Sequence, residues 1–278
     1  MILQINNKPV RSIQKDISDI SFLNDFYEKE GHFPLFQQVL IETRTDCNNN
    51  CPFCPHHFVS KKIGVMEWDC YCRIIDNLCS IGYNGRIALM ISNEPLLEGR
   101  LAEMIKYAKG KSQRFFLDIT TNGRLLTLEK VDYLFSLGLD NINVNDYRGD
   151  RDLRPDGWTP NLVPIVNAYS NNAKISFRKR RLDEKWPNYA GIIPQQFDSS
   201  DFGFCSFPLR KLNISYSGDV ILCCNDFLYE TSFGNVMSRD LVDCWNDKAY
   251  DHYRLSLLDN KRIGLCSKCN DFQDYNAF

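Results

Sequence analysis

Residues 43–55 read Thr-Arg-Thr-Asp-Cys-Asn-Asn-Asn-Cys-Pro-Phe-Cys-Pro, and the rest of the chain is organised around this stretch. Its cysteines, Cys47, Cys51 and Cys54, follow a C-x3-C-x2-C spacing directly after the apolar run 38–41. Such a run is typical of a buried strand, so we expect the cysteines on the loop that leaves its carboxyl end. Thiolates are soft ligands that suit iron–sulfur clusters and zinc. Because a [4Fe–4S] cluster held by cysteine alone uses four thiolates, three would leave one iron open to another molecule.

The C-x3-C-x-aromatic-C pattern, with Phe53 as its aromatic residue, resembles the motif of the radical S-adenosylmethionine (radical SAM) family. The resemblance implies a [4Fe–4S] cluster on the three cysteines and SAM on the open iron, with Phe53 beside the cofactor. It also implies reductive cleavage of SAM to a 5′-deoxyadenosyl radical. A zinc knuckle is the alternative, although His56 and His57 would give an awkward ligand spacing.

Composition places the chain among ordinary globular proteins. Its 278 residues are 44% hydrophobic and carry a net charge of −2, which supports a core and gives no electrostatic footprint for nucleic acid or an anionic membrane. No apolar run is long enough to cross a bilayer, and residues 1–6 lack the pattern of a signal peptide. We therefore expect a cytoplasmic protein that binds neither nucleic acid nor membrane.

After the cysteine loop, apolar strands alternate with amphipathic helices. We expect strands at 38–41, 86–91, 115–119, 141–145 and 173–177, and helices at 66–83, 101–108 and 128–137. This alternation indicates right-handed βαβ units around a parallel sheet. With the resemblance, it predicts an α/β fold: a partial (β/α)6 TIM-like barrel with a small C-terminal β-hairpin plus helix domain that binds a cluster. We assign 1–35 to an N-terminal extension with a helix at 20–30, 36–200 to the barrel and 201–278 to the cluster domain.

Polar side chains follow the carboxyl ends of these strands, where parallel α/β folds bind ligands. Residues 92–95, Ser-Asn-Glu-Pro, stand where the family has Gly-Gly-Glu-Pro, the motif that receives the methionine amino group; both glycines are replaced. Residues 120–123, Thr-Thr-Asn-Gly, resemble its strand-end element near the ribose and methionine. The resemblance assigns contacts with SAM to Ser92, Asn93, Glu94, Thr121 and Asn122.

The two later strands also carry polar residues. Asn143 and Asn145 lie on a strand otherwise suited to a core, so we expect them to face the cofactor, and Asp146 is a candidate catalytic residue. Arg178 is the candidate to bind the methionine carboxylate, because a guanidinium binds carboxylate in a fork. A turn, a cap or a solvated face is the structural alternative for such residues.

The last quarter of the chain holds a second group of cysteines. Residues 212–222 are expected to form a hairpin and 241–258 a helix, between Cys205 and a final C-x2-C. This order resembles the twitch domain, a shortened SPASM region that holds one auxiliary [4Fe–4S] cluster. The resemblance implies the ligands Cys205, Cys223, Cys266 and Cys269. Cys224 or Cys244 could replace one of them, and zinc is again the alternative.

Residues 188–191, Asn-Tyr-Ala-Gly, are expected to cross the barrel mouth between the two clusters. One twitch-bearing dehydrogenase of the family has Asn-Arg-Gly-Gly there, and its arginine is held to act in substrate deprotonation. Tyr189 is therefore a candidate catalytic residue, although a phenol with a pKa of about 10 cannot replace a guanidinium in ion pairing. Packing of the domain junction is the structural alternative.

Together these features predict an enzyme that uses SAM and two [4Fe–4S] clusters. The first hypothesis is hydrogen abstraction from a small polar metabolite resembling a sugar or cyclitol, with the auxiliary cluster assisting an oxidation. The second is radical modification of a peptide or protein by crosslinking, epimerisation or oxidation. A non-catalytic metal scaffold is the third. Both enzyme hypotheses require an electron donor such as flavodoxin or ferredoxin.

Overall fold

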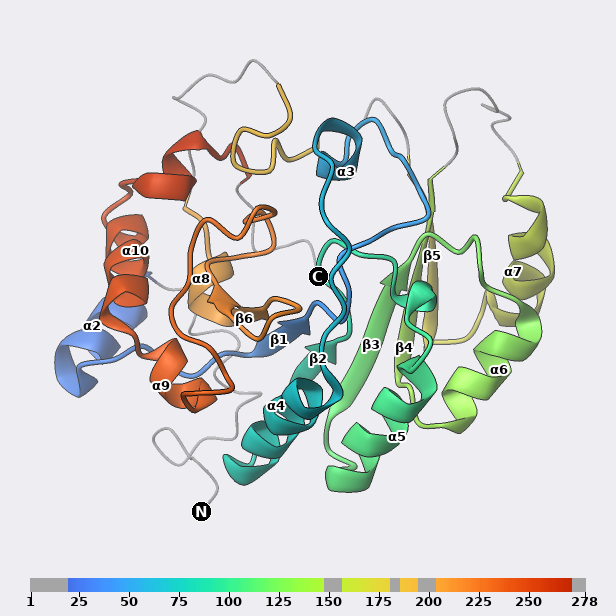
Figure 1. Ribbon diagram of the computed structural model, residues 1–278, viewed down its shortest axis with the longest axis horizontal. Coiled ribbons are helices and arrows are strands. Elements are labelled where there is room, and N and C mark those ends of the chain that lie inside the picture. The colour runs from blue at the N-terminus through green and yellow to red at the C-terminus, as the bar shows by residue number, and fades with distance from the viewer. Residues whose placement is uncertain (1–19, 148–156, 181–185, 195–203, 272–278) are drawn as a thin grey trace.

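A curved, mostly parallel sheet forms the centre of the protein in the computed structural model (Figure 1). The structure describes residues 20–147, 157–180, 186–194 and 204–271. The strands are β1 (Gln38–Ile41), β2 (Arg86–Ala88), β3 (Phe116–Thr121), β4 (Asn141–Tyr147), β5 (Ile175–Arg180), β6 (Lys211–Ile214) and β7 (Val220–Ile221). The α-helices are α2 (Ile20–Glu30), α3 (Pro55–Phe58), α4 (Trp68–Ser80), α5 (Leu101–Lys111), α6 (Leu128–Ser136), α7 (Val163–Tyr169), α8 (Phe207–Arg210), α9 (Leu241–Trp245) and α10 (Lys248–Leu258).

The sequence periodicities produce this layering directly. The helix α4 has apolar residues at helical spacing and buries Tyr71, Ile74 and Leu78. Strand β4 alternates, so that Ile142 and Val144 are buried on the side that the helices cover. Helices α4 to α7 follow the outer side of the sheet, while the cysteine loop and α3 lie at the ends of its strands (Figure 1). The predicted α/β architecture is confirmed: the sheet is open rather than a closed barrel, in the order β5-β4-β3-β2-β1-β6-β7 among the described residues.

The sheet continues past the predicted domain boundary at residue 200. Strand β6 pairs parallel with β1, in the register Val39 to Leu212, and β7 pairs antiparallel with β6. The predicted hairpin is therefore present, and its first strand is also the sixth parallel strand of the main sheet. The region that carries the second group of cysteines is joined to the barrel by backbone hydrogen bonds.

The expected helix at 241–258 is two helices. α9 ends at Trp245, and α10 begins after Asp247, whose carboxylate accepts a hydrogen bond from the backbone of Ala249 at 3.0 Å. This is ordinary N-cap chemistry, because an Asp side chain satisfies a backbone donor in the first turn of a helix. Asn246 and Asp247 therefore interrupt the single helix that the apolar spacing predicted.

The described part of the N-terminal extension packs on the C-terminal region. Leu23 and Phe33 form a small core with Leu209 and Leu258, and α2 lies beside α10 (Figure 1). Residues 1–19 of the predicted extension lie outside the described residues. Among the helices that the structure describes, none has the length and apolar character needed to traverse a bilayer.

Candidate active site

The cysteine loop is closed at its base by a short ladder that holds it at the carboxyl end of β1. The Thr45 N–H donates to the Gly64 carbonyl at 3.0 Å, and the Met66 N–H donates to the Thr43 carbonyl at 2.8 Å. The Gly64 N–H in turn donates to the Thr45 hydroxyl at 2.8 Å. The segment between Asp46 and Lys61 is therefore a loop whose two ends are fixed side by side.

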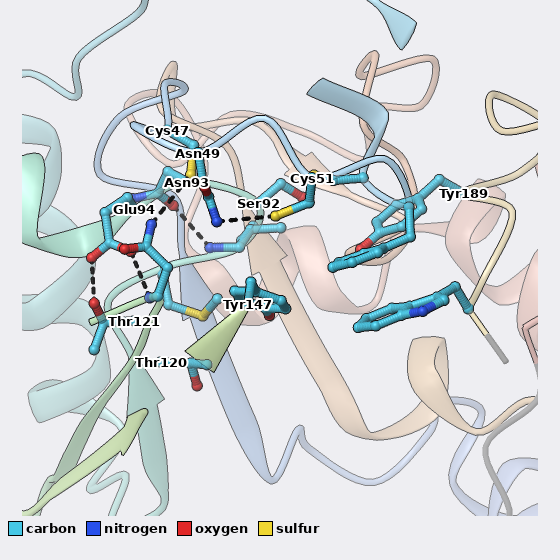
Figure 2. A pocket seen from close by; sticks show the side chains of 16 residues that line it. Cys47, Asn49, Cys51, Ser92, Asn93, Glu94, Thr120, Thr121, Tyr147 and Tyr189 are labelled. Carbon is cyan, nitrogen blue, oxygen red and sulfur yellow. Dashed lines mark hydrogen bonds between the residues drawn. The ribbon is translucent and has the colours of Figure 1, made fainter. Parts of the chain in front are cut away.

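The loop forms one wall of a cavity of about 120 Å³. Ten predicted site residues line it: Cys47, Cys51, Phe53, Cys54, Ser92, Asn93, Glu94, Thr121, Asn122 and Tyr189. Figure 2 shows Glu94 and Thr121 towards one end of this cavity and Tyr189 towards the other. The three strand-end motifs recognised in the sequence are thus brought to one place by the parallel sheet.

Glu94 joins two of these motifs. Its buried carboxylate accepts hydrogen bonds from the Thr121 hydroxyl at 2.6 Å and the Asn122 N–H at 2.8 Å. The Leu96 N–H donates to it at 3.1 Å. Burial raises the pKa of Glu94, and these donors act in the opposite direction. Glu94 therefore fixes the loop after β2 to the end of β3.

The cysteine thiols have amide donors next to them. The Asn49 amide donates to Cys51 Sγ at 3.1 Å, and the Asn122 amide lies 3.8 Å from Cys47 Sγ. Burial raises the pKa of Cys51 to about 12 and that of Cys54 to about 11. Without a metal these thiols are therefore protonated at neutral pH, and binding of iron must release their protons.

Asn93 supplies an unused donor at the cavity. Its Oδ1 accepts a hydrogen bond from the Ile91 N–H at 3.1 Å, which identifies the other side-chain atom as Nδ2. Nδ2 is buried and has no hydrogen-bond partner among the described atoms. A buried amide donor beside three thiols suits an anionic group of a ligand, since an unpaired buried donor is otherwise costly. The donor set therefore fits a thiolate-bound cluster together with a ligand that carries a carboxylate.

An aromatic wall closes the other end of the cavity. Phe53 stacks on Trp186, with ring centroids 3.7 Å apart and planes 8° apart, and lies 5.5 Å from the ring of Tyr147. The guanidinium of Arg180 lies 4.3 Å from the Trp186 ring. One face of Phe53 is thus covered by Trp186, a residue that sequence reasoning did not assign to the site. Tyr147 could have been found, because it shares a strand face with Asn143 and Asn145.

Three predicted cofactor contacts do not line the cavity: Asn143, Asn145 and Arg178. Asn143 lies on the Tyr147 face of β4, where it accepts a hydrogen bond from the Ser176 hydroxyl at 2.8 Å. Arg178 is exposed and stands opposite Asn145 in the sheet register. Asn143, Asn145 and Arg178 therefore lie on β4 and β5 outside the lining of the cavity.

Asp146, the candidate catalytic residue on β4, does not line the cavity. It lies on the other face of β4 from Tyr147 and is 2% exposed. Its carboxylate accepts hydrogen bonds from the Thr159 N–H at 2.9 Å and the Thr159 hydroxyl at 2.6 Å. Asp146 therefore anchors the segment before α7 through Thr159.

The second group of cysteines surrounds a separate, smaller cavity of about 20 Å³. All four predicted ligands line it: Cys205, Cys223, Cys266 and Cys269. Cys224 and Cys244 do not line it, and Cys244 is buried in α9. Burial, followed by repulsion from neighbouring thiolates, raises the pKa of Cys266 to about 12.

One turn connects the two cavities. Tyr189 lines the first cavity and Ala190 lines the second. Both residues have a left-handed backbone, with φ of 48° and 53°. Such a conformation costs of order 1–3 kcal/mol for each residue other than glycine and persists only where the surroundings hold it. Burial raises the pKa of Tyr189 well above its ordinary value, so its phenol stays protonated.

Comparison with protein-family models matches residues 41–155 to the radical SAM superfamily and residues 205–270 to SPASM, an iron–sulfur cluster-binding domain. The chain is a radical SAM enzyme with a SPASM-type domain. A radical SAM domain binds a [4Fe–4S] cluster and SAM, and a SPASM domain binds further iron–sulfur clusters. The cofactors expected from the sequence are therefore confirmed, and iron–sulfur clusters replace the zinc alternative.

This radical SAM chain is 25% identical over 241 residues to the S-adenosyl-L-methionine-dependent 2-deoxy-scyllo-inosamine dehydrogenase of Niallia circulans, covering 85% of this chain and 94% of that protein. The crystal structure of BtrN in complex with AdoMet and 2-DOIA superposes with a TM-score of 0.76 at 23% identity, over 88% of this chain and 98% of that one. Streptococcus suis SuiB bound to the precursor peptide SuiA gives a TM-score of 0.52 at 13% identity, over 90% of this chain and 72% of that one. At these identities the two structures demonstrate the shared fold.

Proposed function

We propose that this radical SAM enzyme oxidises a small polar metabolite of the amino-cyclitol or sugar class at a carbon that bears a hydroxyl or amine. The observation that carries the proposal is the single turn that lines both cavities through Tyr189 and Ala190. A substrate in the first cavity would lie next to a site that can accept an electron. The dehydrogenase name of the Niallia circulans relative supports the same reaction class.

The roles of the cofactor-binding residues follow from their contacts. Cys47, Cys51 and Cys54 would bind the first cluster, and Asn93 Nδ2 would donate to the carboxylate of SAM. Glu94 would keep the loop after β2 in register with Asn122. When bound, the cluster and SAM supply a 5′-deoxyadenosyl radical that removes a hydrogen atom from the substrate.

The overall change is a two-electron oxidation. One hydrogen atom would leave the substrate carbon and the hydroxyl or amine proton would pass to water. The remaining electron would be taken up by a cluster held by Cys205, Cys223, Cys266 and Cys269, so that a carbonyl or imine results. The protonated phenol of Tyr189 would hold a polar substrate group by a hydrogen bond. The wall of Phe53, Trp186 and Tyr147 would exclude water from the reacting atoms.

The test uses anaerobically reconstituted protein with a chemical reductant, SAM and 2-deoxy-scyllo-inosamine as the probe. We expect 5′-deoxyadenosine together with the oxidised cyclitol, and neither from Cys47→Ala/Cys51→Ala/Cys54→Ala. Tyr189→Phe should keep both clusters and SAM cleavage but lower product formation by about tenfold, the value of one hydrogen bond. SAM cleavage without oxidation of this probe or of related amino-cyclitols and sugars would overturn the proposal. A flavodoxin or ferredoxin is the proposed electron donor in place of the chemical reductant.

A peptide or protein substrate is the second candidate. Its support is the fold shared with SuiB, which was crystallised with its precursor peptide. Crosslinking, epimerisation or oxidation of a peptide would use the same first cavity. Mass spectrometry of precursor peptides encoded beside the gene, after incubation with the reduced enzyme, would distinguish this reaction from cyclitol oxidation.

A further inference from the structure

Asn188 holds the connecting turn against the loop of the second cysteine site. Its backbone N–H donates to Asn270 Oδ1 at 2.7 Å, and the Asn270 N–H donates back to Asn188 Oδ1 at 3.1 Å. Asn188 Nδ2 also donates to the Lys268 carbonyl at 2.8 Å. Asn188 is 1% exposed, so these bonds are shielded from water. The amide side chain of Asn188 is thus fully engaged with residues 268–270.

The turn that Asn188 begins needs such support. Tyr189, Ala190 and Gly191 all have positive φ angles, of 48°, 53° and 90°. The N–H groups of Gly191 and Ile193 donate to the Asn188 carbonyl at 3.1 and 3.0 Å. A Cβ on Gly191 would lie 3.4 Å from Lys268 Cβ, so the turn lies directly against this loop. Two consecutive left-handed residues other than glycine persist only when neighbouring contacts hold them.

The partner loop carries two of the second site's cysteines. Lys268 lies between Cys266 and Cys269, and Asn270 follows Cys269 directly. The cysteines line the second cavity, in and directly after the short helix Gly264–Lys268. A cluster bound to both cysteines would fix the backbone atoms with which Asn188 forms hydrogen bonds. Without that cluster, the loop would be held by hydrogen bonds alone, such as the one from Arg262 to the Cys269 carbonyl at 2.9 Å.

We propose that Asn188 is a positioning residue that makes the placement of Tyr189 in the first cavity depend on a loaded auxiliary cluster. The proposal rests on the proposed function insofar as Cys266 and Cys269 are cluster ligands. Enzyme without the second cluster would still cleave SAM but would lack the ordered turn beside the substrate. The substrate would then be held productively only when its electron acceptor is in place.

The first test measures amide hydrogen exchange of the peptide 186–193 by mass spectrometry and needs no substrate. It compares the reconstituted holoenzyme with Cys266→Ala/Cys269→Ala, which lacks the second cluster. We expect exchange of this peptide to rise by about tenfold or more, because its amides are then protected only by local turn bonds. Cys244→Ala, at a buried cysteine of α9 that lines neither cavity, should keep both clusters and leave this exchange unchanged. Unchanged exchange after loss of the second cluster would overturn the proposal.

The second test separates the asparagine pair from the cluster itself. Asn270→Ala removes the acceptor for the Asn188 N–H and should raise exchange even with full iron content. Asn270→Asp keeps an acceptor oxygen and should restore protection. Ser267→Ala, on the same loop but bonded only locally to the Gly264 carbonyl, is the matched control. If peptide 186–193 of Asn270→Ala exchanged as slowly as in the wild type at full iron content, the hydrogen bonds between Asn188 and Asn270 would not position the turn, and the proposal would fail.

A third measurement tests whether the order of the turn at residues 188–191 affects product formation. With 2-deoxy-scyllo-inosamine as the probe, Asn270→Ala should form less product for each 5′-deoxyadenosine released, while Asn270→Asp should match the wild type. If no cyclitol is oxidised by the wild type, the proposed function fails while the exchange results stand. If Cys266→Ala/Cys269→Ala keeps its full iron content, the ligand assignment fails instead.

Discussion

The two cysteine sites use the same ligand in opposite settings. At the first site Cys47, Cys51 and Cys54 are partly exposed and share a cavity of about 120 Å³ with polar groups from two strand ends. At the second site four cysteines line a cavity of about 20 Å³, which is the number of thiolates that a [4Fe–4S] cluster held by cysteine alone uses. Three thiols at the first site would leave one iron of a cluster open to a ligand, whereas four thiols at the second site would leave none open. The number of cysteines therefore distinguishes a site that can bind SAM on an open iron from a site whose irons would all be bound by protein thiolates.

The largest expected effect is at the first site. Cys47→Ala, Cys51→Ala or Cys54→Ala should abolish release of 5′-deoxyadenosine. The two remaining thiolates are too few to hold the [4Fe–4S] cluster on which SAM binds. The measurement is chromatography of the anaerobic reaction with reductant and SAM. The second cluster should remain, with about four irons per chain against about eight in the wild type. Cleavage of SAM by the triple variant would contradict the assignment.

Cysteine-to-alanine substitution at the second site should leave SAM cleavage intact and stop substrate oxidation. Cys266→Ala/Cys269→Ala should keep SAM cleavage, lose about four irons and abolish the oxidised product. Cys244→Ala is the matched control, because Cys244 is equally buried but lies in α9 away from the second cavity. Iron analysis and product chromatography decide the outcome. Loss of iron from Cys244→Ala would mean that it, and not one of the four, is a ligand.

Glu94 should have a smaller effect that is confined to the first site. Glu94→Gln replaces one acceptor oxygen with a donor, which loses a bond from Thr121 or Asn122. We expect the KM for SAM to rise by about tenfold with both clusters retained, the value of one charged hydrogen bond. Glu98→Gln is the control, because Glu98 is also buried but pairs with Arg100 outside the cavity. Equal effects of the two variants would show that only folding is disturbed.

The smallest effect on catalysis is expected at Asp146. Asp146→Ala removes both acceptors of Thr159 and should lower the free energy of unfolding by about 1–3 kcal/mol. The rate of SAM cleavage by folded protein should not change, because the carboxylate lies on the face of β4 away from the cavity. Thermal unfolding and a cleavage assay at low temperature measure the two quantities. A large loss of cleavage with normal stability would restore Asp146 as a catalytic candidate.

Local sequence patterns predicted the part of the site that lies at strand ends. The spacing of Cys47, Cys51 and Cys54 and the positions of Glu94 and Asn122 are set along the chain, and parallel strands bring their carboxyl ends to one edge. Asp146 shows what the same patterns leave undecided, namely which face of a strand each polar residue occupies. Adjacent strand residues face opposite sides, so Asn145 and Asp146 could not both face the cavity.

The sequence by itself determined the cofactors, the alternation of strands and helices and the two groups of cysteines, because each depends on residues close together in the chain. Only the tertiary structure decided that β6 lies beside β1, that Trp186 covers Phe53 and that Asn188 pairs with Asn270. The asparagine pair joins positions 82 residues apart, and no periodicity or spacing specifies such a contact. It forms because the parallel pairing of β6 with β1 brings the second cysteine region to the barrel mouth.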